Sequence, residues 1–263
     1  MKKFLLLLLL FLLIACTNNN QKSPDKQVKQ TEKHSPCRII EQNGQHHYSV
    51  CSFTPEYLQT HLSLAWKDPQ TDKPFYQFAP LNDWLNTQNK MLIFAMNAGM
   101  YDDNFAPIGL TVIDGKEIKS LNQKDGQGNF HLMPNGVFWG DKDGFYIDTT
   151  PDFANKMANI TPQLATQSGP ILVIDGNIHP KFDPKSTSVK MRNGVGTGCA
   201  DGQIHFVISG TPMTFYEFAK LFQMDLSCQN ALFLDGGVAS TLYAPSIKRF
   251  DKHSMGVMLI VSE

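Results

Sequence analysis

The 263-residue sequence predicts an α+β domain with a largely antiparallel or mixed β-sheet core and a few helices. Three observations favour this fold class. Apolar runs are repeatedly joined by Asp-Gly pairs, at Asp114, Asp175 and Asp201, and this dipeptide is typical of tight hairpin turns. Helical patterns are few. The stretch 231–234 is apolar at every position, which indicates a strand buried on both faces. We therefore expect the three Asp-Gly aspartates to form turns and to have no catalytic role.

Residues 1–15 are expected to be a signal peptide. Two lysines precede the apolar run 4–14, which is too short to cross roughly 30 Å of hydrocarbon as a helix. The run ends just before Cys16 in a pattern that resembles a bacterial lipobox, so we predict lipidation of Cys16 and a membrane anchor. Because Thr17 follows in place of an aspartate, the periplasmic face of the outer membrane is expected in a diderm host. A plain signal peptide is the alternative.

The segment 16–36 is expected to form a disordered tether behind that lipidated cysteine. It is polar and contains too few apolar residues to offset the entropy of ordering. Residues 37–263 remain as a single domain, long enough for one packed core. The net charge is -1 and no basic tail is present, so nucleic acid is not an expected partner.

Four cysteines remain if Cys16 carries lipid, and a signal peptide would deliver them to an oxidising compartment. Four cysteines allow three pairings. We consider Cys37–Cys51 and Cys199–Cys228 as disulfides, and free buried thiols are the alternative for both pairs. No CxxC motif occurs, so neither a thioredoxin-like site nor a zinc ribbon is indicated.

Helices are expected over 80–89 and 214–224. In the second, Thr214 and Glu217 have the spacing of a capping box, in which each side chain satisfies a free backbone amide at the helix start. Three phenylalanines then fall on one face of this helix, which is typical of packing against a core.

Polar side chains stand beside glycines where apolar strands begin or end. They are Asn97, Asn135, the pair Arg192 and Asn193, and Asp235. Each one alone fits a turn. Together they also fit polar groups that converge on a pocket where glycines leave room for a ligand, and the spacing alone leaves both interpretations open. No P-loop, GxSxG, HExxH or EF-hand pattern occurs, so we predict no cofactor and find no indication of a metal site.

Several linked motifs resemble the phosphodiester glycosidase family. They are "NAGMYDDNFAPIGLTVIDGK", "PNGVFW", "SGPILVIDG", "RNGVGTG", "FVISG" and "ALFLDGGVASTLY", in this order between Cys51 and Val261. The family includes the enzyme that uncovers mannose 6-phosphate by removing an N-acetylglucosamine cap. Its last motif usually reads Asp-Gly-Gly-Gly-Ser-Ser/Thr. Here Val238 and Ala239 replace part of that run, which is expected to narrow the pocket beside Asp235.

The resemblance implies hydrolysis of the glycosidic C–O bond of a sugar-1-phosphodiester, on cell-envelope glycans. Phosphate departs as a stabilised anion, so charge stabilisation matters more than protonation of the leaving group. We expect Asp235 to activate water or attack the anomeric carbon, Arg192 to grip the phosphate through two hydrogen bonds, and Asn97 to bind sugar or phosphate. Further substrate-binding candidates are Asn135, His179, Gly236, Gly237, Ser240 and Thr241, with Asp102 and Asp103 as possible second carboxylates.

Two other functions fit the same sequence. One is a non-catalytic lipoprotein that binds glycan or another cell-envelope polymer. The other is a phosphodiesterase that cleaves the P–O bond. The presence of Asp235 together with Arg192 and Asn97 favours an enzyme, because a simple binder needs no carboxylate facing an anionic ligand.

Overall fold

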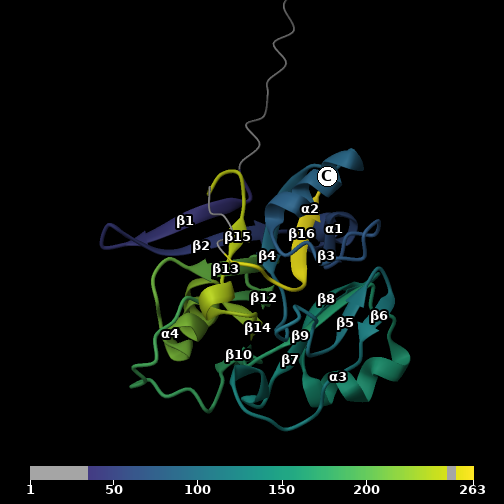
Figure 1. Ribbon diagram of the computed structural model, residues 1–263. Coiled ribbons are helices and arrows are strands. Elements are labelled where there is room, and N and C mark those ends of the chain that lie inside the picture. The colour runs from purple at the N-terminus through teal and green to yellow at the C-terminus, as the bar shows by residue number, and fades with distance from the viewer. Residues whose placement is uncertain (1–34, 248–252) are drawn as a thin grey trace, which may run out of the picture. The chain divides into compact units, whose positions relative to one another are not determined.

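Three β-sheets surround a shared hydrophobic core in the computed structural model, which describes residues 35–247 and 253–263 (Figure 1). Every strand pairing in these residues is antiparallel. Helices are short and pack on the outer faces of the sheets. The predicted α+β class with a largely antiparallel core is confirmed.

The largest sheet has seven strands. In spatial order they are β1 (Cys37–Gln42), β2 (Gln45–Phe53), β13 (Ile204–Ser209), β12 (Asn193–Cys199), β14 (Cys228–Phe233), β10 (Ile171–Ile174) and β11 (Asn177–Ile178). Leu234 follows β14 and is fully buried, so the predicted apolar stretch 231–234 does lie inside the protein.

The two smaller sheets complete the enclosure of the core. The four-stranded sheet has the order β15 (Leu242–Tyr243), β4 (Leu92–Asn97), β16 (Met258–Ser262) and β3 (Leu62–Ala65). The five-stranded sheet has the order β6 (Lys116–Lys119), β5 (Thr111–Ile113), β9 (Leu164–Ser168), β7 (Gly136–Asp141) and β8 (Gly144–Thr149).

One phenylalanine from each sheet meets at the centre of the shared core. The ring of Phe206 from β13 lies 4.9 Å from that of Phe94 in β4 and 6.2 Å from that of Phe138 in β7. All three side chains are fully buried. Because each sheet contributes to the same apolar cluster, the strand ends that carry polar residues are held in fixed positions by one core.

Each sheet also has a smaller apolar cluster on its outer side, covered by a helix. α4 (Phe215–Lys220) packs on the seven-stranded sheet, α2 (Phe78–Thr87) on the four-stranded sheet and α3 (Thr150–Lys156) on the five-stranded sheet. The remaining helical segments are α1 (Pro55–His61), η1 (Asn129–His131), η2 (Met157–Asn159), the π-helical turn η3 (Leu221–Asp225) and η4 (Gly237–Ala239).

The capping box predicted for the second helix is present. Thr214 Oγ1 accepts the Glu217 N–H at 3.1 Å, and Glu217 Oε2 accepts the Thr214 N–H at 2.8 Å. The helix then ends as the π-helical turn η3, which the sequence pattern did not predict. α2 begins at Phe78, two residues before the expected start. Its N-cap, Gln77, makes no side-chain capping bond, so the sequence carries no capping signal there.

The Asp-Gly pairs form turns, as predicted. Asp114-Gly115 joins β5 to β6 with φ of 50° and 74°, and Asp175-Gly176 joins β10 to β11 with φ of 47° and 77°. Two successive positive φ values are the signature of the tight hairpin turn that this dipeptide favours. Asp201 lies in the connection from β12 to β13, where its side chain accepts the Gln203 N–H at 3.0 Å.

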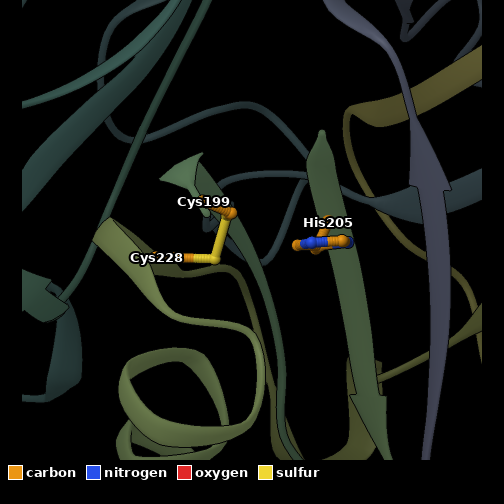
Figure 2. A group of neighbouring side chains, drawn as sticks. All are labelled: Cys199, His205 and Cys228. Carbon is orange, nitrogen blue, oxygen red and sulfur yellow. A yellow bond between two sulfur atoms is a disulfide. The ribbon is translucent and has the colours of Figure 1, made fainter. Parts of the chain in front are cut away.

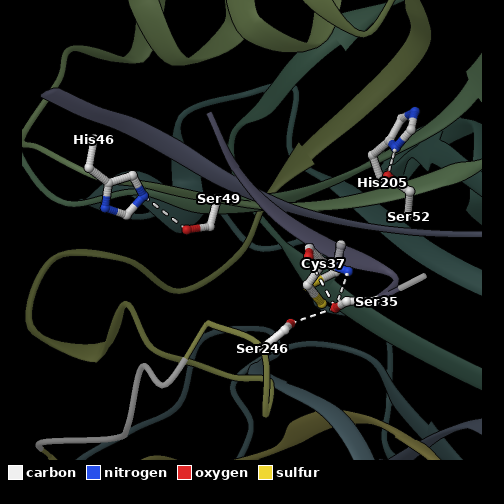
Figure 3. Close-up of a disulfide and its surroundings, with 8 residues drawn as sticks. Ser35, Cys37, His46, Ser49, Ser52, His205 and Ser246 are labelled. Carbon is white, nitrogen blue, oxygen red and sulfur yellow. Dashed lines mark hydrogen bonds between the residues drawn. A yellow bond between two sulfur atoms is a disulfide. The ribbon is translucent and has the colours of Figure 1, made fainter. Parts of the chain in front are cut away.

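Two disulfides bridge neighbouring antiparallel strands. Cys37–Cys51 joins β1 to β2, and Figure 3 shows its surroundings. Cys199–Cys228 joins β12 to β14. Both bonds link residues that face each other directly in the strand register, so each holds one strand pair together at that position.

Figure 2 shows His205 near the second disulfide. One ligand atom from each of Cys199, Cys228 and His205 lies within 4.8 Å of the others. Because the two sulfur atoms are bonded to each other, neither is available as the thiolate that a metal would require. His205 instead has hydrogen-bond partners in Ser52 Oγ at 2.8 Å and Asp201 Oδ1 at 3.2 Å.

The predicted signal peptide, Cys16 and most of the tether lie outside the described residues. The described residues from Ser35 onward form one compact unit. Among the residues that the structure describes, no helix combines the length and the apolar character needed to cross a membrane.

Candidate active site

The ends of all three sheets meet at the segment 97–99. Asn97 is the last residue of β4 in the four-stranded sheet. The next residue, Ala98, accepts the backbone N–H of Asp235, just beyond β14, at 3.0 Å. Gly99 donates its N–H to Thr166 Oγ1 in β9 at 2.9 Å. This segment therefore links the Asp235 end of the seven-stranded sheet to the five-stranded sheet.

The Asn97 side chain holds the neighbouring backbone together. Its Nδ2 donates to the Asp235 carbonyl oxygen. Its Oδ1 accepts from Asn193 Nδ2 at 2.9 Å and from the Thr241 N–H at 3.1 Å. Asn97 is only 1% exposed. Protein groups therefore occupy this amide, and the structure gives it a positioning role in place of the direct substrate contact that the sequence analysis expected.

The Asp235 carboxylate is half-buried and has no ion-pair partner in the described part of the chain. Burial raises the pKa of the Asp235 carboxyl to about 7, and a hydrogen bond from the Gly236 N–H opposes part of the rise. A carboxyl group with a pKa near neutrality can exchange a proton at physiological pH, which is the property required of a general acid or base.

Tyr101 lies beside this carboxylate. Burial raises the pKa of its phenol to about 12, and the charge of Asp235 adds to the rise. The Tyr101 hydroxyl donates to the Ser254 carbonyl oxygen at 3.1 Å. The sequence analysis counted Asn193 among the polar residues beside glycines without giving it a role, and it quoted Tyr101 only within a motif. The glycine that follows Asn193 was the available signal for that residue.

The two hydroxyl residues that follow Asp235 belong to the same network. Ser240 is half-buried, and its hydroxyl donates to Asn193 Oδ1 across 3.4 Å, a long hydrogen bond. Thr241 donates its backbone N–H to Asn97, whereas its Oγ1 is buried without a hydrogen-bond partner among the described residues. Thr241 and the Asp235 carbonyl thus bind the same Asn97 amide, and Ser240 binds the neighbouring Asn193.

The two glycines after Asp235 have different reasons to be glycine. A Cβ on Gly236 would lie 2.3 Å from the ring of Phe233, so the Phe233 ring leaves no space for a side chain at this position. That finding corrects the expectation that Gly236 leaves room for a substrate. Gly237 has φ of 73° and no atom within 4 Å of its would-be Cβ. Of the pair, only Gly237 faces open space.

Arg192 is buried among protein groups. Its Nε donates to the Met213 carbonyl at 3.0 Å and its Nη2 to the Ser188 carbonyl at 3.2 Å. The guanidinium carbon lies 3.5 Å from the centre of the Phe215 ring, and the residue is only 2% exposed. The edge of the guanidinium that would grip a phosphate through Nε and Nη2 is therefore already occupied.

Arg192 and Asp235 are not an interacting pair. No ion pair joins them, and Arg192 has no carboxylate partner in residues 35–247 and 253–263. Burial is the only cause that lowers the pKa of Arg192 to about 10. The shared phosphate site predicted for these two residues is thus not formed by direct contact. The Arg192 guanidinium connects the loop at Ser188 to the segment at Met213.

In the described residues, Asn135 and His179 make no hydrogen bond to the Asp235 network. Asn135 Nδ2 donates to the Phe130 carbonyl at 2.8 Å. His179 stacks on Phe182 with ring centres 4.6 Å apart, and its Nδ1 accepts the Lys181 N–H at 3.1 Å. Burial, together with the charge of Lys181, lowers the pKa of His179. Both residues are thus held by protein contacts, although each keeps one buried polar atom without a partner in the described residues.

Four buried polar atoms have no hydrogen-bond partner among the described residues: Asn135 Oδ1, Ser168 Oγ, His179 Nε2 and Thr241 Oγ1. Ser168 ends β9 and faces Gly136 across the strand pair, next to Asn135. Sequence reasoning gave no signal for Ser168. Unsatisfied buried polar groups are rare in folded proteins, so each of these four atoms has an unused capacity for a hydrogen bond.

Asp102 and Asp103 do not provide a second carboxylate to Asp235. Both side chains are exposed. Asp102 Oδ1 accepts the N–H groups of Asn104 at 2.9 Å and Ala106 at 3.1 Å, so it shapes the turn after Tyr101. This is the usual local role of an aspartate in a turn and corrects the expectation for Asp102.

Residues 90–259 match the phosphodiester glycosidase family, and the chain belongs to that family. The matched range contains the Asn97 network and Asp235 together. A glycosidase-type hydrolase is therefore the class that the family and the position of the carboxylate support.

Individual proteins resemble the chain to different extents. The uncharacterized protein YigE of Escherichia coli K12 is 36% identical over 185 residues, which cover 65% of this chain and 70% of YigE. The catalytic domain of zebrafish N-acetylglucosamine-1-phosphodiester alpha-N-acetylglucosaminidase, auto-inhibited by its pro-peptide, is similar in structure with a TM-score of 0.58 at 16% identity. The likeness covers 86% of this chain and 81% of that domain. At this identity the structural likeness defines the fold.

Proposed function

We propose that this protein hydrolyses the glycosidic C–O bond of a sugar-1-phosphodiester, with Asp235 as the catalytic carboxylate. One observation carries the proposal. Asp235 is a half-buried carboxyl group without an ion-pair partner in the described residues, and burial raises its pKa to about 7. The family match supplies the reaction class.

In the proposed reaction the ionised Asp235 removes a proton from a water molecule as the water oxygen bonds to the anomeric carbon. Attack by the carboxylate itself, followed by hydrolysis of the glycosyl ester, is the second route. In both, the bond from the anomeric carbon to the phosphate oxygen breaks and its electron pair leaves with the phosphate. The products are a free sugar and a phosphomonoester.

We assign phosphate recognition to the hydroxyl groups of Ser240 and Thr241. Ser240 borders solvent, and Thr241 Oγ1 lacks a protein partner in the described residues. Both follow Asp235 closely in the chain, and Asn97 fixes Thr241 and Asp235 through the same amide. We assign Arg192 a structural role, because its Nε and Nη2 donors already bind backbone carbonyl groups.

The sugar and the cellular setting are also part of the proposal. The similar zebrafish enzyme acts, by its name, on an N-acetylglucosamine-1-phosphodiester, so N-acetylglucosamine is the first sugar to test. The lipobox-like sequence before Cys16 favours a lipid anchor in the cell envelope, where phosphodiester-linked glycans would be the substrates. Changing Cys16 to serine should abolish labelling with radioactive palmitate and release the protein from membranes. Retention on membranes without the label would refute the anchor.

The reaction is tested with methyl phosphodiesters of glucose, galactose and N-acetylglucosamine in both anomers. Hydrolysis in ¹⁸O-water should place the label in the sugar hydroxyl and leave the phosphate unlabelled, with a no-enzyme control for exchange at the anomeric carbon. Label in the phosphate would instead identify a phosphodiesterase that cleaves P–O. Binding without turnover of any diester would favour the non-catalytic glycan-binding alternative.

A further inference from the structure

Two aromatic residues near the candidate site have an unusual backbone conformation. Tyr76 has φ of 62° and Phe105 has φ of 61°. Bulky residues other than glycine rarely adopt positive φ, because the side chain then crowds the backbone. The two rings contact each other edge to face, with centres 5.0 Å apart and planes at 82°.

The surrounding structure holds both residues in this conformation. The Tyr76 carbonyl accepts the Met255 N–H at 2.8 Å, and the nearby Phe75 and Phe78 are buried in the apolar cluster of the four-stranded sheet. The Phe105 carbonyl accepts the Trp66 Nε1–H at 2.9 Å. Strained residues that are fixed by several neighbours are found mainly at ligand-binding positions.

This aromatic pair is continuous with the Asp235 site. The Phe105 ring stacks on the Tyr101 ring, with centres 5.5 Å apart and planes at 27°. Tyr101 in turn packs against Gly256, where a Cβ would lie 2.9 Å from the ring. The next residue, Val257, accepts the N–H of Ala98, the residue that binds the Asp235 backbone.

Tyr76 is the exposed member of the series, with 37% of its surface open, and no hydrogen bond of its hydroxyl is found in the described residues. An edge-to-face contact with Phe105 leaves ring surface available. Two ring-to-ring contacts, with centres 5.0 Å and 5.5 Å apart, separate Tyr76 from Tyr101. This series of rings leads outward from the Asp235 site to an exposed aromatic face.

We infer that Tyr76 is the stacking platform for a second pyranose ring of the substrate, beyond the sugar that is attacked at Asp235. The C–H groups of a pyranose face carry slight positive charge and pack against the electron-rich face of an aromatic ring. The phenol hydroxyl offers a hydrogen bond to a sugar hydroxyl. This inference rests on the proposed function for its substrate class, and it selects diesters that carry two sugars over diesters that carry one.

The test measures binding by isothermal titration to the soluble domain that carries Asp235→Asn, so that neither ligand is hydrolysed. The ligands are methyl glucose-1-phosphodiester, with one ring, and glucose-1-phospho-6-glucose, with two. Tyr76→Gly removes the ring and accepts the positive φ without strain. It should weaken binding of the two-ring ligand by about 2- to 12-fold, the contribution of one aromatic contact, and leave the one-ring ligand unchanged.

Tyr146→Ala is the matched control, because Tyr146 is equally exposed, at 39%, but lies on β8 in the five-stranded sheet. It should change neither affinity. Equal affinities of Tyr76→Gly and the starting protein for the two-ring ligand would overturn the inference, and so would an equal loss for both ligands or no binding of the two-ring ligand at all. Hydrolysis of the methyl diester by wild-type protein tests the proposed function separately, since that ligand carries no second ring.

Discussion

Asp235 differs from three other aspartates that precede a glycine, Asp114, Asp175 and Asp201. Asp114, Asp175 and Asp201 are exposed, and each lies in a connection between two adjacent antiparallel strands. Asp235 is half-buried, and the chain continues into η4 instead of turning back along β14. Gly236 has φ of -123°, an extended value, whereas the glycines of the three turns all have positive φ.

The Asp-Gly dipeptide alone therefore does not determine whether its aspartate is an exposed turn residue or a buried carboxylate. In the hairpins, the next strand pairs at once with the last, so the aspartate is pushed to the surface. After β14 the backbone N–H of Asp235 binds Ala98 in another sheet, and its carbonyl binds the Asn97 amide. Contacts between sheets therefore keep this carboxylate partly out of water.

Aspartate-to-asparagine substitutions test whether only Asp235 has a catalytic role. Asp235→Asn keeps the shape and removes the base, so kcat on the sugar-1-phosphodiesters should fall by about 10² to 10⁴. Asp114→Asn should leave kcat unchanged, because asparagine also tolerates the positive φ of that turn. Full activity in Asp235→Asn would show that all four aspartates are turn residues.

The pH dependence of the reaction provides a second test of the role of Asp235. Burial raises the pKa of Asp235 to about 7, and the proposed mechanism uses the ionised form. The value of kcat/KM should therefore rise with pH, reach half of its maximum near pH 7 and level off above it. Asp114→Asn should show the same curve. A profile that falls with pH through this range would instead indicate that Asp235 acts as an acid.

The same raised pKa predicts a stability change of known sign. The folded protein holds the Asp235 proton more tightly than the unfolded chain, so wild-type stability should decrease as pH rises from about 4 to about 7. Asp235→Asn lacks this loss and should be more stable than wild type at pH 8, by on the order of 2–4 kcal/mol. Urea unfolding at pH 8 and pH 4 measures it. A difference that is the same at both pH values would contradict a buried, titrating Asp235.

A conservative change at Arg192 separates structure from catalysis near the site. Arg192→Lys keeps the charge but loses the stacking on Phe215 and the two directed hydrogen bonds, so the free energy of unfolding should drop by about 1–3 kcal/mol. The kcat of the remaining folded protein should be close to that of wild type. A large loss of kcat at unchanged stability would restore the phosphate grip that the sequence suggested.

The smallest expected effects distinguish the glycines of the two kinds of Asp-Gly pair. Gly236→Ala forces a Cβ against the Phe233 ring and should cost about 1–3 kcal/mol of stability through overpacking. Gly115→Ala meets only the Gln163 side chain, at an ordinary contact distance of 3.4 Å, but places alanine at positive φ, which costs about 1–2 kcal/mol. Thermal unfolding of the two variants compares them. A stabilised Gly236→Ala would mean that this position is not packed as described.

Sequence reasoning succeeded where the relevant contacts are local. The capping box of Thr214 and Glu217 lies within one helical turn, and each hairpin turn is set by two adjacent residues. The Asn97 amide instead binds Asn193, Asp235 and Thr241, which are close only after three sheets have assembled. The positive φ of Tyr76 and Phe105 carries no signal at all, because neither residue type favours that conformation.

The first disulfide has a mechanical consequence. A pull on the chain ahead of Ser35 would otherwise peel β1 from β2 one hydrogen bond at a time. Cys37 opens β1 and is bonded to Cys51, so the load passes covalently to β2, which is paired with β13 inside the sheet. The hairpin between them is shielded from force. In a single-molecule pulling experiment, reducing this bond should add 14 residues of extensible chain, about 50 Å, before the sheet itself bears the tension.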